Sequence, residues 1–231
     1  MTSSPTSKHI HHHGTTAHRV VVFLVIAATL VMLAFASMVS ADTKLRPDQV
    51  ITQTTNQMLE ALKQEHELTN QHPARVQELA NQIIMPHVDF QRMSSWVLGK
   101  HWRRATAQQK QQFPEQFRNL ILRTYATALS EYTDETISYL PLHAKQDATD
   151  VSVKTIIERS AGPGIPVAYR MHQTDDGWKV YDISIDGISL VNNYRRSFSS
   201  EIRRGGLDSL INKLALKNRT VSRNEQKIAS K

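Results

Sequence analysis

The chain contains no cysteine, and this absence removes disulfide bonds, thiolate metal sites and cysteine nucleophiles together. A fold without disulfides must be held by packing, which requires a hydrophobic core of adequate size. Apolar residues make up 40% of the 231 residues and charged residues 21%, and both fractions are ordinary for a globular protein. The composition therefore predicts a packed domain, or at most two.

Motifs of the common enzyme classes are also missing. The sequence contains no G-x-S-x-G, no P-loop, no H-E-x-x-H and no G-x-G-x-x-G. The histidines beyond position 41 are His66, His72, His87, His101, His143 and His172. No two of them are four residues apart, which excludes a local metal-binding pair on a helix. A triad built from distant Ser, His and Asp residues stays open, because triads are defined by geometry.

Two carboxylates, Asp182 and Asp186, alternate along one predicted strand and are compatible with acid–base chemistry. We favour a structural interpretation, in which they face solvent or cap the following turn. We therefore predict that the protein is not an enzyme and uses neither a metal nor a cofactor. A small hydrolase remains the alternative.

The first 41 residues have the features of a signal peptide. Lys8 and Arg19 precede an apolar run, Val20 to Ala36, and Val39-Ser40-Ala41 forms a small-residue cleavage site. We predict export across a membrane and a mature chain that starts at Asp42. The alternative is an uncleaved transmembrane anchor, since the run is near the lower length limit of a spanning helix.

The charge that remains after cleavage is moderately basic. Removing two basic and no acidic residues lowers the formal net charge from +7 to +5. The basic residues are dispersed and no nucleic-acid-binding motif occurs, so we predict no nucleic-acid partner. A net positive charge does suit an approach to anionic membrane surfaces.

The first half of the mature chain has helical periodicity. We expect Asp48 to cap a first helix, Pro73 to open a second that ends by Pro86, and Gly99 to stop a short third one. Thr106 and Gln109 fit a capping box at the start of a long helix that reaches about Tyr132. Inside it, Pro114 should either kink the helix or mark its first turn.

The second half changes to an alternating period of two. The predicted strands are Thr136–Leu140, Val151–Ile157, Ile165–Met171 and Trp178–Ile185, with a tight turn at 175–177. We expect Gly187 to end the sheet and a returning helix to run from Leu190 to the pair Gly205-Gly206. A short last helix should follow, with a frayed polar end beyond Lys217. The fold class is then α+β, a twisted four-stranded antiparallel sheet with several helices packed on one face.

Three blocks of sequence resemble one family. They are WKVYDISIDGISLVNNYR at 178–195, VLGKHWRRAT at 97–106 and GGLDSLI at 205–211. These blocks, in this order, resemble the MlaC (toluene-tolerance) family of periplasmic phospholipid-transport proteins. The likeness covers Gln49 to Asn218, and it divides the chain into a leader (1–41), an MlaC-like phospholipid-binding domain (42–218) and a polar tail (219–231). The departures are His101 in place of a usual tyrosine, Pro114 in the long helix, and a long leader.

The resemblance implies a deep apolar lipid pocket between sheet and helices, with bound phospholipid as cargo. It also implies a shuttle between an outer-membrane lipoprotein complex and an inner-membrane ABC transporter with an MCE-type subunit, which maintains outer-membrane lipid asymmetry. We expect a monomer. A ligand-free adaptor is a second alternative. Headgroup preference, the number of acyl chains and the direction of transport stay open.

The resemblance implies a lipid-binding role for apolar or amphipathic side chains on the predicted faces, and the candidates are Tyr125, Leu129, Tyr169, Met171, Tyr181, Ile183, Ile185, Leu190, Val191 and Tyr194. Tyrosine can hold its ring inside and its hydroxyl at a rim, and methionine fits irregular volumes. Tyr181, Ile183 and Ile185 are expected to share one strand face. Each residue could equally belong to an ordinary core. Arg103 and Arg195 are candidates for contact with a headgroup or a partner, with surface solubility as the alternative.

Overall fold

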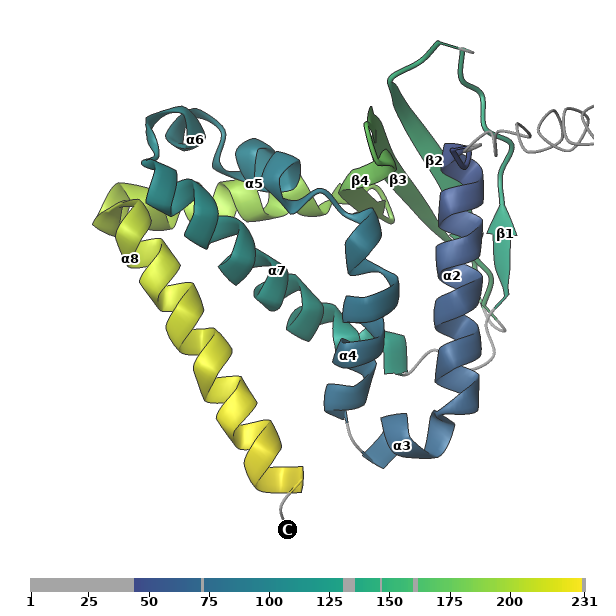
Figure 1. The fold of residues 1–231 in the computed structure, drawn as a ribbon, viewed down its shortest axis with the longest axis horizontal. Helices are drawn as coiled ribbons and strands as arrows, with labels where there is room; N and C mark the ends of the chain where they lie inside the picture. Colours follow the sequence, from purple (N-terminus) through teal and green to yellow (C-terminus); the bar gives the residue numbers. More distant parts are fainter. Residues whose placement is uncertain (1–43, 72, 131–135, 146, 160–161, 230–231) are drawn as a thin grey trace, which may run out of the picture. The chain divides into compact units, whose positions relative to one another are not determined.

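The computed structural model describes residues 44–71, 73–130, 136–145, 147–159 and 162–229, within a compact unit that spans Lys44–Lys231 (Figure 1). The predicted signal peptide lies outside the described residues. The helices are α2 (Pro47–Gln64), α3 (His66–Gln71), α4 (Pro73–Ile83), the 3-10 turn η1 (Met85–His87), α5 (Phe90–Leu98), α6 (Lys100–Arg104), α7 (Ala107–Ser130) and α8 (Leu190–Ala229). Among these, no helix is long and apolar enough to cross a membrane.

The helix starts follow local hydrogen-bonding rules. α2 begins at Pro47, one residue before the predicted cap: Asp48 lies in the first turn, where it binds Arg46 at 3.1 Å. A proline at the first helical position loses no hydrogen bond and has the required φ, which explains this start. α4 begins at Pro73, as predicted. α7 begins at Ala107 behind the predicted capping box, in which Thr106 and Gln109 exchange bonds of 3.2 and 3.0 Å.

Proline and glycine divide the middle helices. The short α5 ends at Gly99, whose φ of 53° is left-handed and favours glycine. A further short helix, α6, follows directly and was not predicted. Pro114 is buried inside α7 and the helix continues through it, so Pro114 does not mark the first turn.

The sheet is an antiparallel meander of five strands rather than four, in the order β1-β2-β3-β4-β5. The strands are β1 (Ile137–Tyr139), β2 (Asp150–Ile157), β3 (Ile165–Thr174), β4 (Gly177–Ile185) and β5 (Ile188–Ser189). The prediction that Gly187 ends the sheet is wrong. Asp186 and Gly187 have φ values of 49° and 77°, and a tight turn with two positive φ values matches strand twist and lets pairing continue.

A β-bulge in β4 changes the faces that we predicted. The register shifts between Arg170 and Met171 of β3, and Tyr181 is the extra residue of β4. The Tyr181 ring contacts the guanidinium of Arg170, whereas Ile183 packs with Met171 on the other face. The expectation that Tyr181 shares a face with Ile183 and Ile185 is therefore wrong, because a bulge breaks the alternation of side chains.

Helices also contact both faces of the sheet, not one. Val50 and Ile51 of α2 pack on the face that carries Met171. Trp96 of α5 instead contacts the guanidinium of Arg170. Arg170 and Met171 are adjacent in β3, so their side chains lie on opposite faces of the sheet. The sheet is thus held between α2 and the α5 end of the helical region.

The C-terminal helix is bent and capped by the sheet. Asp182 Oδ1 accepts a bond from the Val191 backbone at 3.1 Å, and its Oδ2 accepts one from the Ser189 hydroxyl at 2.7 Å. A carboxylate at a helix N-terminus satisfies free N–H groups and the helix dipole. Gly206, with φ 80° and ψ 172°, separates α8 into two helical segments. The second segment continues to Ala229, well beyond Lys217, where we expected fraying.

Candidate functional site

Two apolar clusters flank the junction between helices and sheet. The helical cluster joins buried residues of α5, α7 and α8 around Phe113, Phe117 and Phe198. The sheet cluster consists of Val50, Ile51, Val153, Met171 and Val180. Val88, which precedes α5, packs against both clusters. Its backbone pairs with Val180 in β4, so one short segment connects the two regions.

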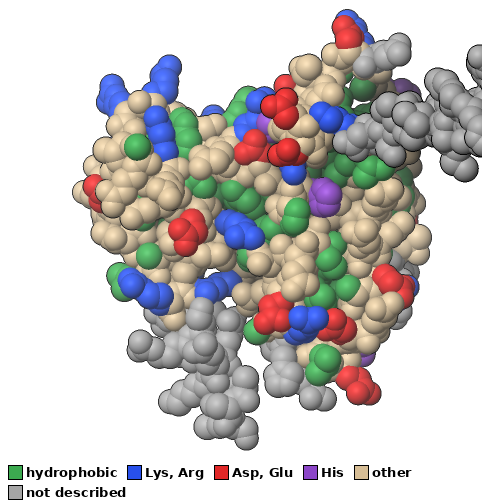
Figure 2. Space-filling model, viewed as in Figure 1, with side chains coloured by type: hydrophobic (Ala, Val, Ile, Leu, Met, Phe, Trp, Pro, Cys, Tyr) green, Lys and Arg blue, Asp and Glu red, His purple; other side chains and the backbone are tan. Residues whose placement is uncertain are grey.

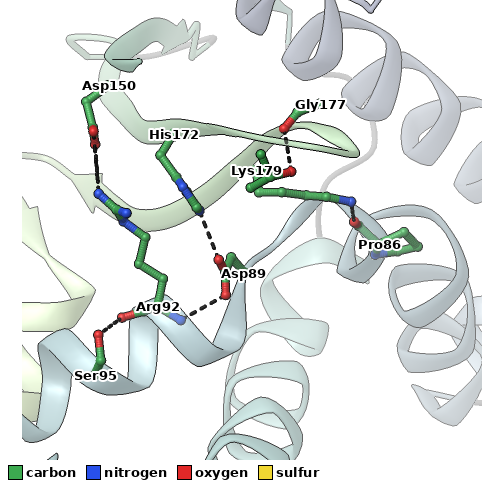
Figure 3. Close-up of polar contacts among 9 residues, drawn as sticks. Pro86, Asp89, Arg92, Ser95, Asp150, His172, Gly177 and Lys179 are labelled. Carbon is green, nitrogen blue, oxygen red and sulfur yellow. Dashed lines mark hydrogen bonds and ion pairs between the residues drawn. The ribbon is translucent and has the colours of Figure 1, made fainter. Parts of the chain in front are cut away.

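Polar side chains reinforce this junction, as Figure 3 shows. His172 of β3 is 8% exposed, and its Nε2 lies 2.9 Å from Asp89 Oδ2. The other carboxylate oxygen of Asp89 caps α5 by accepting a bond from the Arg92 backbone at 2.8 Å. Lys179 of β4 donates to the carbonyl of Pro86 at 2.7 Å. Because Asp89 serves both the helix and the sheet, this His–Asp pair acts as a bridge between α5 and β3.

A second polar group surrounds Tyr181, which is 3% exposed. The guanidinium carbons of Arg92 and Arg170 lie 4.7 and 4.9 Å from its ring centre, and the Trp96 ring lies 5.6 Å away. Burial is the main cause that raises the pKa of Tyr181. The structure therefore places Tyr181 in a cation–aromatic stack between β4 and α5, apart from the other predicted lipid-binding residues.

Three predicted residues do come together on the sheet. Tyr169 and Ile183 face each other across β3 and β4, and both pack against the cluster that contains the fully buried Met171. Burial raises the pKa of the Tyr169 hydroxyl, yet the side chain stays partly accessible to solvent. Tyr169 and Ile183 therefore add partly accessible apolar surface beside the sheet cluster. This is the strongest local indication of a binding surface.

A second group of predicted residues belongs to the helical cluster. Val191 is buried in it, and Tyr125 and Tyr194 pack against its surface. Tyr194 lies edge-on to Phe117 with ring centres 5.1 Å apart. Burial, and to a lesser extent the neighbouring Tyr194, raises the pKa of Tyr125. These residues behave as core or as the border of the core.

The remaining candidates are scattered. Leu190 is buried at the start of α8, whereas Ile185 is 36% exposed. The Leu129 side chain lies outside the described residues. Arg103 is exposed, and the Arg195 guanidinium instead donates to the Trp96 carbonyl, which ties α8 to α5.

Sequence reasoning also missed members of the sheet cluster's border. Val151 and Trp178 are partly buried against it and were not selected. Their signal was present in the alternation of β2 and β4, which places Val151 on the Met171 side. Within the described residues, no group of three or more His, Cys, Asp or Glu could hold a metal ion.

The fold and the junction define a class of mixed α+β proteins in which an antiparallel meander is bridged to a helical bundle. The family model described as "MlaC protein" matches residues 52–216. The chain belongs to the MlaC family.

Three known proteins illustrate the family. The toluene tolerance protein ttg2D of Pseudomonas putida is 30% identical over 163 residues, which cover 70% of this chain and 75% of the relative. The intermembrane phospholipid transport system binding protein MlaC of Haemophilus influenzae is 23% identical over 80% of this chain and 88% of its own length. A solved phospholipid-binding protein from Ralstonia solanacearum, in complex with a phospholipid, is 32% identical with a TM-score of 0.71, covering 77% of this chain and 99% of that one.

Proposed function

We propose that this protein binds a phospholipid and carries it through the periplasm. The observation that carries the proposal is the Ralstonia solanacearum relative, which holds a phospholipid and matches this chain over 99% of its own length at 32% identity. A likeness at that level supports a shared interior as well as a shared fold.

The acyl chains would lie on the face of the sheet that carries Met171. Tyr169 and Ile183 are partly accessible there beside the buried Met171, and further partly buried apolar side chains border the same cluster: Val88, Leu142, Val151 and Trp178. Because these bordering side chains are only partly buried, further apolar cover would increase their burial. Acyl chains laid over these bordering side chains would complete their burial.

Transport needs burial rather than chemistry. A diacyl lipid has roughly 30 methylenes, and at about 0.8 kcal/mol each their exposure costs on the order of 25 kcal/mol. Free transfer across water is therefore negligible, and a carrier lowers that barrier without a nucleophile. The family names fit a shuttle between an outer-membrane lipoprotein complex and an inner-membrane ABC transporter with an MCE-type subunit. Maintaining outer-membrane lipid asymmetry would be the outcome.

A hydrolase receives less support. His172 bonds to Asp89, but among the described residues no hydroxyl nucleophile is hydrogen-bonded to that histidine. The pair bridges α5 and β3 and has this structural role without catalysis.

The test is native mass spectrometry of protein purified from cell envelopes, comparing Ile183→Trp with wild type. Ile183 is partly buried beside Tyr169, so the added ring should occupy space meant for acyl chains and reduce the lipid-bound fraction several-fold. The matched control is Ile188→Trp, since Ile188 is 60% exposed on the neighbouring strand. Wild-type protein that carries no phospholipid after exposure to membranes would refute the function. Equal lipid loading of both variants would refute the site.

A further inference from the structure

A group of unpaired cations gathers where α6 meets the bend of α8. Lys100, Arg103 and Arg104 belong to α6, and Arg203 lies about a hundred residues later, just before the bend at Gly206. All four side chains are exposed. Among the described residues, none of the four forms an ion pair, although neighbouring basic residues do. We name these four residues the elbow patch.

Independent contacts bring the two segments together. Trp102 of α6 and Leu207, just after the bend, pack against the same helical cluster. The Gln109 side chain, at the start of α7, donates to Asp208 at 2.8 Å. The His101 ring lies close enough to Lys100, Arg104 and Arg203 for their charges to lower its pKa, although burial is the larger cause. Figure 2 shows Lys and Arg side chains standing out at this end of the molecule, at the upper left.

The acids nearby are already engaged. Glu201 binds both Arg204 and Lys213, the latter at 2.8 Å, and Asp208 accepts the bond from Gln109. Four cations against the remaining charge of Asp208 leave the elbow patch with a net positive charge. Uncompensated like charges repel one another, and an external anionic surface removes that repulsion.

We infer that the elbow patch docks the protein on an anionic membrane surface. The patch presents long, mobile cations and no apolar anchor. The large hydrophobic side chains that are exposed among the described residues are Leu45, Leu68, Trp96, Tyr139, Leu140, Ile185, Ile188 and Leu216, and none lies on α6 or at the bend. Hot spots of protein interfaces are enriched in aromatic residues and in arginine packed into desolvated pockets, whereas these four cations are exposed with no large exposed apolar side chain beside them. A lipid headgroup layer needs only charge, because its phosphates rearrange around the cations.

The experiment measures binding to vesicles by co-sedimentation. Protein is produced with its own leader, purified from cells and sequenced at its N-terminus, so that all compared preparations share one start. Vesicles contain phosphatidylcholine alone or phosphatidylcholine with about 30% phosphatidylglycerol. Wild type should bind only the anionic vesicles at low salt and should be released near 0.5 M salt, where charges are screened within a few ångströms.

Variants separate the patch from overall charge. Arg103→Glu/Arg104→Glu should weaken partitioning about tenfold or more, and Arg203→Glu alone should weaken it several-fold, since each basic residue near an anionic surface contributes independently. The control Lys145→Glu/Arg159→Glu changes the net charge equally on exposed loop positions of the sheet region and should change partitioning much less.

The outcomes divide cleanly. Loss of binding in both patch variants but not in the control supports the inference. No binding of wild type to anionic vesicles, or equal losses in patch and control variants, overturns it. It is also overturned if the patch variants lose only the capture of an acidic protein partner while vesicle binding is unchanged. Lipid retained by each variant, measured by native mass spectrometry, reports on cargo binding separately.

Discussion

The helical cluster and the sheet cluster fill their interiors differently. In the helical cluster, Phe113 and Phe117 stack with ring centres 5.7 Å apart, and Phe198 lies 5.8 Å from each of them in edge-on geometry. Phe113 and Phe117 are fully buried. The sheet cluster has no such ring contacts between its buried members, which are aliphatic side chains and one methionine. Several of its neighbours, including Tyr169 and Trp178, stay partly accessible.

Under the proposed function, this difference assigns stability to the helical cluster and cargo binding to the sheet cluster. The fully buried, mutually contacting rings identify the helical cluster as the main core of the helical region. Apolar side chains that are only partly buried on the sheet release further free energy when more apolar surface covers them. Val88 and the Asp89–His172 bridge connect the two regions, so the proposed site on the sheet is anchored to the packed core.

The largest expected effect is truncation in the helical cluster. Phe117→Ala removes a fully buried ring that contacts Phe90, Phe113, Tyr194 and Phe198. We expect the free energy of unfolding to fall by about 3–5 kcal/mol, as measured by urea denaturation of delipidated protein. Phe117→Leu, which keeps much of the volume, should cost clearly less. Equal losses for the two variants would contradict a tightly packed core.

Removal of lipid should have the second-largest effect on stability, and this effect should be concentrated in the sheet region. A ligand that binds only the folded state stabilises it by about 3 kcal/mol when present at a hundred times its Kd. Delipidated protein should therefore melt at a lower temperature. Hydrogen exchange should become faster in β3 and β4 than in α7. Uniform changes across both regions would contradict the division between core and cargo surface.

The bridge between the regions should have an intermediate effect. His172→Phe keeps an aromatic ring but leaves the partly buried Asp89 carboxylate without its partner, and we expect a loss of about 1–3 kcal/mol. Adding Asp89→Asn, which keeps the cap on α5, should recover part of this loss. A double-mutant cycle in urea measures the coupling. A coupling near zero would show that the His–Asp contact is incidental.

The sequence predicted what local rules decide. Pro73, the capping box at Thr106 and the turn before β4 were placed correctly, because each rests on backbone chemistry within a few residues. It missed the bulge at Tyr181 and the fifth strand, since both depend on pairing between strands. The same limit applies to the site. Periodicity identifies apolar faces, but it cannot tell that Tyr181 lies in the cation–aromatic stack while Tyr169 lies beside the sheet cluster. The two residues are of the same type, so only the folded structure distinguishes their surroundings.

The smallest expected effect is a difference in pKa response between Tyr125, which borders the helical cluster, and Tyr169, which borders the sheet cluster. Burial raises the pKa of both Tyr125 and Tyr169. A raised phenol pKa means that the folded state holds the proton more tightly than the unfolded state. This stabilisation is complete below pH 10 and is lost as the pH rises through the folded pKa. Acyl chains over the sheet would exclude water from Tyr169 alone and raise its pKa further.

Alkaline titration of tyrosinate absorbance, with and without bound lipid, therefore measures the comparison directly. Subtracting the curve of Tyr169→Phe from that of wild type isolates Tyr169, and Tyr125→Phe does the same for the helical cluster. We expect delipidation to lower the pKa of Tyr169 and to leave that of Tyr125 unchanged. If delipidation lowers only the pKa of Tyr125, the lipid must bind beside the helical cluster instead. The reason is that only a hydroxyl that loses its apolar cover becomes exposed to water.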